Sequence, residues 1–280
     1  MGVLENKIDF AVVFSVNKAN PNGDPLDGNR PRVDYDGYGE VSDVCLKRKI
    51  RNRLQDFGER IFVQSEDRKD DGCKSLQDRV NACAALKEVK KDADAYARAA
   101  CETWMDVRSF GQVFAFDKGL SVGVRGPVTV QTAVSVLPID ATSMQISKSV
   151  NGKTTGDGGK GSDTLGTKHR VDFGIYRFFG SINVQLAEKT GFTDEDAEKI
   201  RRALQSLFEN DCSSARPEGS MEVLRVYWWR HNCKSGQYSS AKVHRSIKIE
   251  VAEDGKTLDD YQFTVEPLEG LDVGVFDGLQ

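Results

Sequence analysis

The order of three segments near the amino terminus constrains the fold most: an apolar strand, a turn-rich loop and a basic helix. Residues 8–17 alternate in period two, which predicts a core strand with one fully apolar face made of Ile8, Phe10, Val12, Phe14 and Val16. Residues 20–32 then concentrate Asn, Pro, Gly and Asp, which indicates a structured loop. Ser42 offers a helix N-cap, and apolar residues follow at helical spacing at Leu46, Ile50, Leu54 and Phe57.

The rest of the chain predicts a mixed α+β domain. Valine recurs at even positions from Val122 to Val136, which predicts a strand, and Pro127 within it indicates an edge or a bulge. Thr193 predicts the cap of a helix with an apolar stripe at Ala197, Ile200, Leu204 and Leu207. Further strands are expected at 223–229 and 243–251. The resulting order, β-α-β and again β-α-β, is that of a ferredoxin-like domain.

Two stretches interrupt this order. Residues 65–104 are polar and helical in pattern, with a stripe at Leu76, Val80, Cys83 and Leu86, and predict a helical insertion. Residues 138–172 lose the apolar rhythm, because six of these 35 residues are Gly and nine are Ser or Thr, and they predict a long β-hairpin arm. One decorated domain of 280 residues accounts for the whole chain.

Composition narrows the class of protein. The six cysteines include no C-x-x-C pair, which argues against a zinc knuckle or a redox pair and favours reduced thiols. The first ten residues carry no apolar signal region, and nowhere do 18 apolar residues run together, so we expect a cytoplasmic protein without a membrane partner. A net charge of −4 argues against promiscuous polyanion binding, so any nucleic-acid site must be local.

Familiar catalytic motifs fail on inspection. Residues 156–161 satisfy G-x-G-x-x-G, but no strand precedes them and no helix follows, and the Gly required for a P-loop before Gly152-Lys153-Thr154 is Ser147. The loop aspartates do not follow EF-hand spacing. The three histidines (His169, His231 and His244) are far apart in the sequence, and structural or surface roles are expected for them. No cofactor and no metal is therefore expected.

One segment does suit recognition of a polyanion. Residues 42–53 hold five basic side chains against Asp43 alone, although such a run is also typical of a solvated helix face. Lys47 and Arg51 lie one helical turn apart, so both can point at one row of phosphates. Groups that can bind phosphate or ribose accompany them in the preceding loop and at the helix cap: Asn20, Asn22, Asn29, Arg30, Arg32 and Ser42. Turn stabilisation explains the asparagines equally well.

Two long strings carry a specific resemblance. NPNGDPLDGNRPRVD followed by GEVSDVCLKRKIRNRL resembles the amino-terminal signature of the backbone subunit of the type I-C CRISPR Cascade complex, in the RAMP superfamily. DVRSFGQVFAF and VRGPVTVQTAVSVLP are similar to the central strands of that family. The resemblance spans most of residues 7–250.

The resemblance implies a hand-shaped protein with a modified RNA-recognition fold. A ferredoxin-like palm would comprise residues 6–64, 105–137 and 173–251, with a helical finger at 65–104, a hairpin thumb at 138–172 and a carboxy-terminal extension at 252–280. Several copies would line up head to tail along one CRISPR guide RNA, hold its backbone without reading sequence, and present segmented bases to complementary target DNA. The implied partners are that RNA and DNA, neighbouring copies, the guide-processing cap subunit, large and small Cascade subunits, and a recruited nuclease-helicase.

The resemblance also adds residues to the candidate site. Arg108 and Arg125 lie in family-like palm segments and are expected to face RNA. The thumb needs an apolar wedge, for which Met144 is the first choice among Met144, Ile146, Val150 and Leu165, and Lys148 and His169 accompany it as RNA-binding residues.

Two enzymatic alternatives stay open. Related type III backbone subunits cut target RNA with an aspartate in the loop after the first strand, which Asp34 or Asp24 would supply here. Other RAMP proteins process precursor guide RNA with His or Tyr, and His169 is the histidine near the proposed groove. Because the signature resembles type I, a non-catalytic structural subunit is the preferred interpretation.

Overall fold

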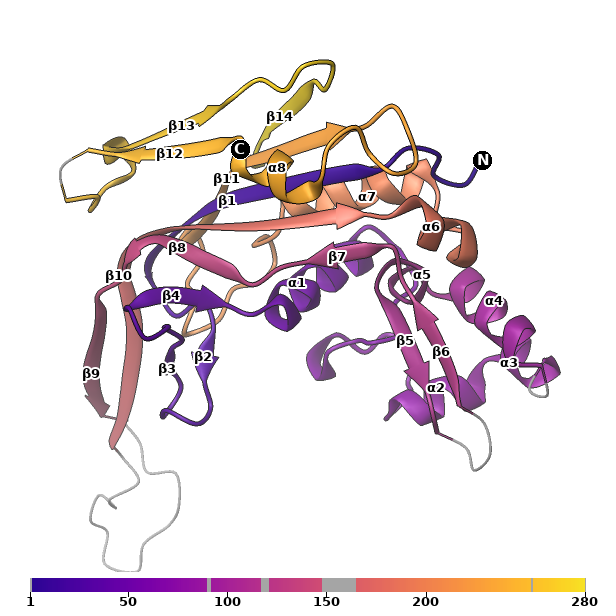
Figure 1. Ribbon diagram of the computed structural model, residues 1–280. Helices are drawn as coiled ribbons and strands as arrows, with labels where there is room; N and C mark the ends of the chain where they lie inside the picture. Colours follow the sequence, from indigo (N-terminus) through magenta and orange to yellow (C-terminus); the bar gives the residue numbers. More distant parts are fainter. Residues whose placement is uncertain (1, 90–91, 117–120, 148–164, 253, 280) are drawn as a thin grey trace, which may run out of the picture.

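A central antiparallel sheet organises the computed structural model of the protein, which describes residues 2–89, 92–116, 121–147, 165–252 and 254–279. Among these residues the sheet has eight strands in the order β14-β11-β1-β10-β8-β4, and β7 and β9 also pair with β10 (Figure 1). Its strands are β1 (Ile8–Ala19), β4 (Tyr38–Val41), β7 (Val128–Val130), β8 (Ala133–Pro138), β9 (Ala141–Ser147), β10 (Leu165–Ile182), β11 (Met221–Arg230) and β14 (Val273–Asp277).

Strand β1 lies in the middle of the sheet because both of its faces are apolar. It pairs with β10 from Ile8↔Ile182 onward and with β11 from Ile8↔Arg230 onward. The predicted face packs into the larger core cluster, whereas Ala11 and Val13 are buried in a second cluster on the opposite face. The sequence pattern therefore identified one buried face, and the sheet has two.

Helices α1 (Asp43–Asp56), α6 (Val184–Thr190) and α7 (Asp194–Gln205) contribute to the larger core on one face of the sheet. The predicted caps are confirmed: the Ser42 side chain accepts a hydrogen bond from Cys45 N, and Thr193 forms a reciprocal capping box with Asp196. The predicted stripes of both helices pack into this core, in which Phe57 is only partly buried. These local signals and the tertiary packing agree, which explains why both helices could be predicted from sequence.

The opposite face is covered by α8 (Ser240–Arg245) and by a separate two-stranded sheet of β12 (Ile247–Val251) and β13 (Tyr261–Val265). The short 3-10 helix η3 (Leu258–Asp260) lies between these two strands in the sequence. The prediction of one strand over 243–251 was wrong in its first half. Ser239 caps a helical turn through Lys242 N, and this turn buries Val243 against the sheet. The short period-two pattern could not separate that turn from the strand after it.

A side lobe with its own core extends from the sheet at the right of Figure 1. It is built from η1 (Glu66–Arg68), α2 (Leu76–Ala82), α3 (Ala84–Glu88), α4 (Ala93–Thr103), α5 (Met105–Phe110), β5 (Gly111–Phe114) and β6 (Val122–Arg125). Phe62, Tyr96, Trp104 and Phe114 contact one another inside it. The valine run predicted as one strand is divided, because β6 pairs with β5 in this lobe while β7 and β8 join the central sheet.

Two histidines that are distant in the sequence meet at a buried carboxylate. Asp9 is fully buried, and its Oδ2 contacts His231 Nε2 at 2.8 Å and Lys7 Nζ at 3.0 Å. His244 Nε2 lies 3.8 Å from the other carboxylate oxygen, Oδ1. His231 Nδ1 accepts the Gln237 N–H, so its proton resides on Nε2 and points at Asp9. This cluster ties β1 to the segment that follows β11. In the described part of the chain, no helix combines the length and the apolarity that crossing a membrane requires.

Candidate nucleic-acid interface

The loop after β1 is held in shape by the asparagines that the sequence singled out. Asn20 Nδ2 donates to Asn29 O at 2.7 Å, and Asn22 Oδ1 accepts Ser42 N at 2.9 Å. Asn29 adopts a left-handed conformation with φ of 64° beside the hairpin of β2 (Gly23–Asp24) and β3 (Arg30–Pro31). Asn20 and Asn22 therefore use side-chain amide groups to fix the loop.

The two loop arginines are differently placed. Arg30 is exposed and lies 3.9 Å from Asp27, a distance that leaves the guanidinium accessible. Arg32 is half-buried and 3.4 Å from Asp24. Both pairs are long and loose, so phosphate groups can compete for these cations at little cost.

On α1 the predicted residues split into an exposed and an internal group. Ser42 uses its hydroxyl as the helix cap, and Lys47 Nζ pairs with Asp43 at 2.9 Å at a half-exposed site. Arg51, one turn further, donates Nε to the buried Asp106 at 2.9 Å and stacks over the Phe110 ring at 5.0 Å. Its side chain is only 13% exposed, so Arg51 joins α1 to α5 and does not present its charge with Lys47.

Arg108 also lies inside the protein. Its Nε and Nη2 both bind the Asp196 carboxylate at 2.8 Å, and Nη1 donates to Cys101 O. Burial alone would raise the pKa of Asp196, but the hydrogen bonds and charge of Arg108 outweigh burial and lower that pKa below its ordinary value. This forked pair joins α5 to the first turn of α7.

The β9–β10 arm has two chemically different faces. Directly paired residues share a face, and the pairs Met144↔Lys168 and Thr142↔Arg170 alternate with Ser143↔His169. One face therefore combines the apolar Met144 with Lys168 and Arg170, and the next pair along it is Ile146, which is 50% exposed, with Gly166. On the opposite face the His169 ring bonds Ser143 Oγ at 2.8 Å.

Lys168 and Arg170 were missed by the sequence analysis. Their signal was the spacing Lys-x-Arg in a strand, which places both cations on one face, but the strand pairing needed to set Met144 beside them was unknown. The structure separates His169 from Met144. Two further predicted thumb residues, Lys148 and Val150, lie outside the described residues.

The loop and the arm project from the same side of the sheet. In Figure 1 the β2–β3 hairpin hangs beside the arm of β9 and β10, and β3 contacts β10. Arg30 and Arg32 therefore lie near the base of an arm that carries its own basic and apolar face. Arg125 is separate, because it sits exposed on the β5–β6 hairpin at the other end of the molecule. The basic loop and the adjacent β9–β10 arm, with its basic and apolar face, together suit a chain of phosphates with unstacked bases.

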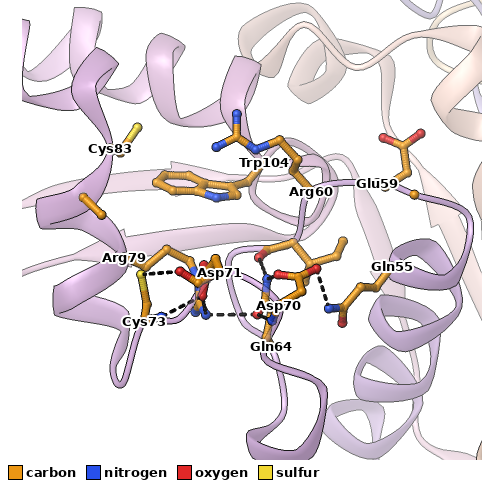
Figure 2. A pocket seen from close by; sticks show the side chains of 13 residues that line it. Gln55, Glu59, Arg60, Gln64, Asp70, Asp71, Cys73, Arg79, Cys83 and Trp104 are labelled. Atoms are coloured by element: carbon orange, nitrogen blue, oxygen red, sulfur yellow. Dashed lines mark hydrogen bonds and ion pairs between the residues drawn. The ribbon is translucent and has the colours of Figure 1, made fainter.

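A small cavity of about 240 Å³ lies in the side lobe, between α1 and α2 (Figure 2). Figure 2 shows Arg79 pointing at Asp71 and Gln64. Its guanidinium contacts both Asp71 oxygens, Gln64 Oε1 and Phe62 O. Because the Arg79 guanidinium is held by these contacts, we assign this group to holding α2 onto the lobe.

The Arg79 contact predicts an acid-sensitive contribution to stability. The hydrogen bonds from Arg79 lower the pKa of Asp71 to about 2. A carboxylate whose pKa is lower in the folded protein stabilises it above its unfolded pKa of about 3.9, and this stabilisation is lost as the pH falls toward 2. We expect Asp71→Asn to lower the free energy of unfolding at pH 6, and to lower it much less at pH 2.5, in denaturant titrations.

The neighbouring Asp70→Asn is the matched control. Asp70 accepts side-chain hydrogen bonds from the amides of Gln55 and Gln64 and receives none from the Arg79 guanidinium, so its replacement leaves the Arg79–Asp71 contact in place. An Asp71→Asn effect of equal size at pH 6 and pH 2.5 would contradict the assignment.

Comparison with known proteins identifies the family. Residues 6–266 match the family model described as CRISPR-associated protein Cas7. Over 265 residues the chain is 29% identical to the CRISPR-associated protein Cas7 of Haloferax volcanii, covering 87% of this chain and 75% of that protein.

One solved structure supports the fold. A chain of a pre-nicking CRISPR RNA-guided surveillance complex aligns with a TM-score of 0.52 and 16% identity, covering 84% of this chain and 83% of that chain. A chain of another CRISPR RNA-guided surveillance complex aligns with a TM-score of 0.47 and 17% identity, over 80% of this chain and 68% of that chain. With the family model matching almost the whole sequence, the chain belongs to the Cas7 family of CRISPR-associated proteins.

Proposed function

We propose that this chain is the RNA-binding backbone subunit of a type I-C CRISPR surveillance complex. It holds the sugar-phosphate backbone of a guide RNA without reading its sequence, and it presents the bases to complementary target DNA. The observation that carries this proposal is the arm face on which Lys168 and Arg170 flank Met144, beside a loop that carries Arg30 and Arg32. Cations suit phosphates, whereas apolar wedges separate bases of any sequence.

The architecture supports a hand-shaped subunit. The order β1, α1, β8 and then β10, α7, β11 repeats β-α-β twice, as a ferredoxin-like palm requires. The part of the side lobe at residues 65–104, which precedes α5, is the proposed finger, and the arm within 138–172 is the proposed thumb. In the proposed extension at 252–280, β14 lies at the edge of the central sheet.

The subunit would work as one part of a larger assembly. Its proposed partners are guide RNA, target DNA, neighbouring copies, the guide-processing cap subunit and the large and small subunits. DNA cutting would fall to a recruited nuclease-helicase. Asp34 and Asp24, the aspartates considered for RNA cleavage, both serve the loop: Asp34 Oδ1 accepts Asp36 N and Tyr38 N, and Asp24 Oδ1 accepts Leu26 N. These hydrogen bonds favour a structural role for both.

The salt dependence of RNA affinity tests the proposal. Each cation that contacts single-stranded RNA contributes about 0.7 to the slope of log affinity against log salt concentration. We expect Lys47→Ala to flatten that slope by about 0.7, equally for guide RNAs of unrelated sequence. Arg51→Ala is expected to leave the slope unchanged, because Asp106 holds that charge inside the protein.

Lys248→Ala supplies the matched control. Lys248 is an exposed lysine paired with Glu266 on the separate β12–β13 sheet, so it should not alter the slope. Losses that depend strongly on RNA sequence, or equal effects of Lys47→Ala and Lys248→Ala, would argue against backbone recognition at α1.

A further inference from the structure

A turn between β3 and β4 presents an aromatic side chain to solvent. Tyr35 is fully exposed, at 109% relative accessibility. Its turn is rigid, because Asp34 Oδ1 accepts the N–H groups of Asp36 and Tyr38, and Asp34 N donates back to Tyr38 O at 2.9 Å. A large exposed side chain on a fixed turn loses little conformational freedom when it binds, so this tip is prepared for contact.

The charges beside Tyr35 decide what it contacts. Asp34 and Asp36 flank Tyr35 in the sequence, and neither has an ion-pair partner within the described ranges of the chain. Two carboxylates repel a phosphate backbone, so stacking on RNA bases is disfavoured at this tip. The same carboxylates suit a protein surface that offers a cation beside an apolar platform.

The outer face of the β5–β6 hairpin offers such a surface. The hairpin buries Phe114 and Val122 in the side lobe, whereas Val113 is 62% exposed and pairs with Gly123. A Cβ placed on Gly123 would meet no atom within 4 Å, so the backbone there is open to a flat ring. Arg125, two residues further along β6, is exposed and has no ion-pair partner in the part of the structure that is described.

We propose that the Asp34-Tyr35-Asp36 tip of one copy docks on the Val113–Gly123–Arg125 face of the next copy. The β3–β4 turn and the β5–β6 hairpin lie at opposite ends of the molecule in Figure 1. Two different complementary surfaces at opposite ends make a heterologous contact that repeats from copy to copy. Tyr35 stacks on the Gly123 backbone against Val113, while Arg125 pairs with Asp36.

The cooperativity with which several copies bind one RNA measures the strength of this contact. This test rests on the proposed function, because it requires the protein to bind RNA. The full-length protein is titrated onto an RNA that admits one copy and onto an RNA that admits several, and copies per RNA are counted by mass photometry. Tyr35→Ala and Arg125→Glu are expected to leave one-copy affinity unchanged and to reduce cooperativity by about tenfold or more. Lower one-copy affinity would instead place these residues on RNA and overturn the proposal.

A charge-exchange experiment gives the decisive test of the contact. Asp36→Lys and Arg125→Glu each place like charges at every contact, so each variant alone should load poorly. An equimolar mixture restores opposite charges at every contact when the two variants alternate along the RNA, and it should recover cooperativity. Because recovery requires both variants to be folded, it also excludes misfolding. No recovery, or wild-type cooperativity in either variant alone, overturns the contact.

A failure of the proposed function is distinguishable from a failure of this contact. If the wild type binds no RNA, sedimentation of the RNA-free protein at rising concentration still compares self-association of the wild type, the single variants and their mixture. Self-association weakened by each substitution and restored by mixing supports the contact, whereas identical sedimentation of all four samples contradicts it.

Discussion

Replacing Asp106 with alanine is expected to lower the free energy of unfolding by about 3 kcal/mol or more. Asp106 is fully buried, and its carboxylate accepts Phe62 N at 2.7 Å, Val63 N at 3.1 Å and Arg51 Nε at 2.9 Å. Removing it leaves two backbone donors and one guanidinium without their acceptor at the junction of α1 and the side lobe. Urea unfolding followed by circular dichroism measures the loss.

The double variant Asp106→Ala with Arg51→Ala tests whether the two residues stabilise the protein through the same interaction. Arg51→Ala alone should destabilise the protein, and adding it to Asp106→Ala should cost little more, because the two residues share one interaction. Strictly additive losses would show that Arg51 and Asp106 act independently. An Asp106→Ala protein as stable as the wild type would contradict the structural assignment of both residues.

The contrast between Lys47 and Arg51 marks where sequence reasoning stops. Helical spacing correctly placed both on one flank of α1, and the Ser42 cap and the apolar stripe of the helix were predictable from local patterns. Whether a cation faces solvent depends on what packs against the helix. Asp106 is 55 residues away in the sequence, so its partnership with Arg51 carries no local signal. The pair of Arg108 and Asp196, 88 residues apart, likewise has no local signal in the sequence.

Strand pairing limits prediction in a similar way. The arm was expected over 138–172, and Met144 was chosen there as a wedge, but only the register sets Lys168 opposite Met144 and His169 opposite Ser143. A shift of one residue would exchange the two faces. The division of the valine run between two sheets also depends on pairing, because β6 forms a local hairpin with β5 whereas β7 pairs with β10, about 50 residues further along the chain.

The arm face is where substitution should affect RNA affinity most. Lys168→Ala with Arg170→Ala removes two cations from the face that carries Met144. At about 0.1 M salt each lost phosphate contact costs roughly 0.7 in log affinity, so we expect RNA binding to weaken about twentyfold. Fluorescence anisotropy with several guide RNAs of unrelated sequence measures the change, which should be the same for all of them.

The opposite face of the same arm provides the control, which tests whether RNA binds specifically to the face that carries Met144, Lys168 and Arg170. Gln145→Glu with Thr167→Glu changes the net charge by the same amount as the double alanine variant, but on the face that carries His169. RNA affinity measured for both double variants under identical salt should fall only for Lys168→Ala with Arg170→Ala, and stay within about twofold of wild type for the other. Equal losses from both faces, or loss only from the His169 face, would contradict guide binding by this basic and apolar surface.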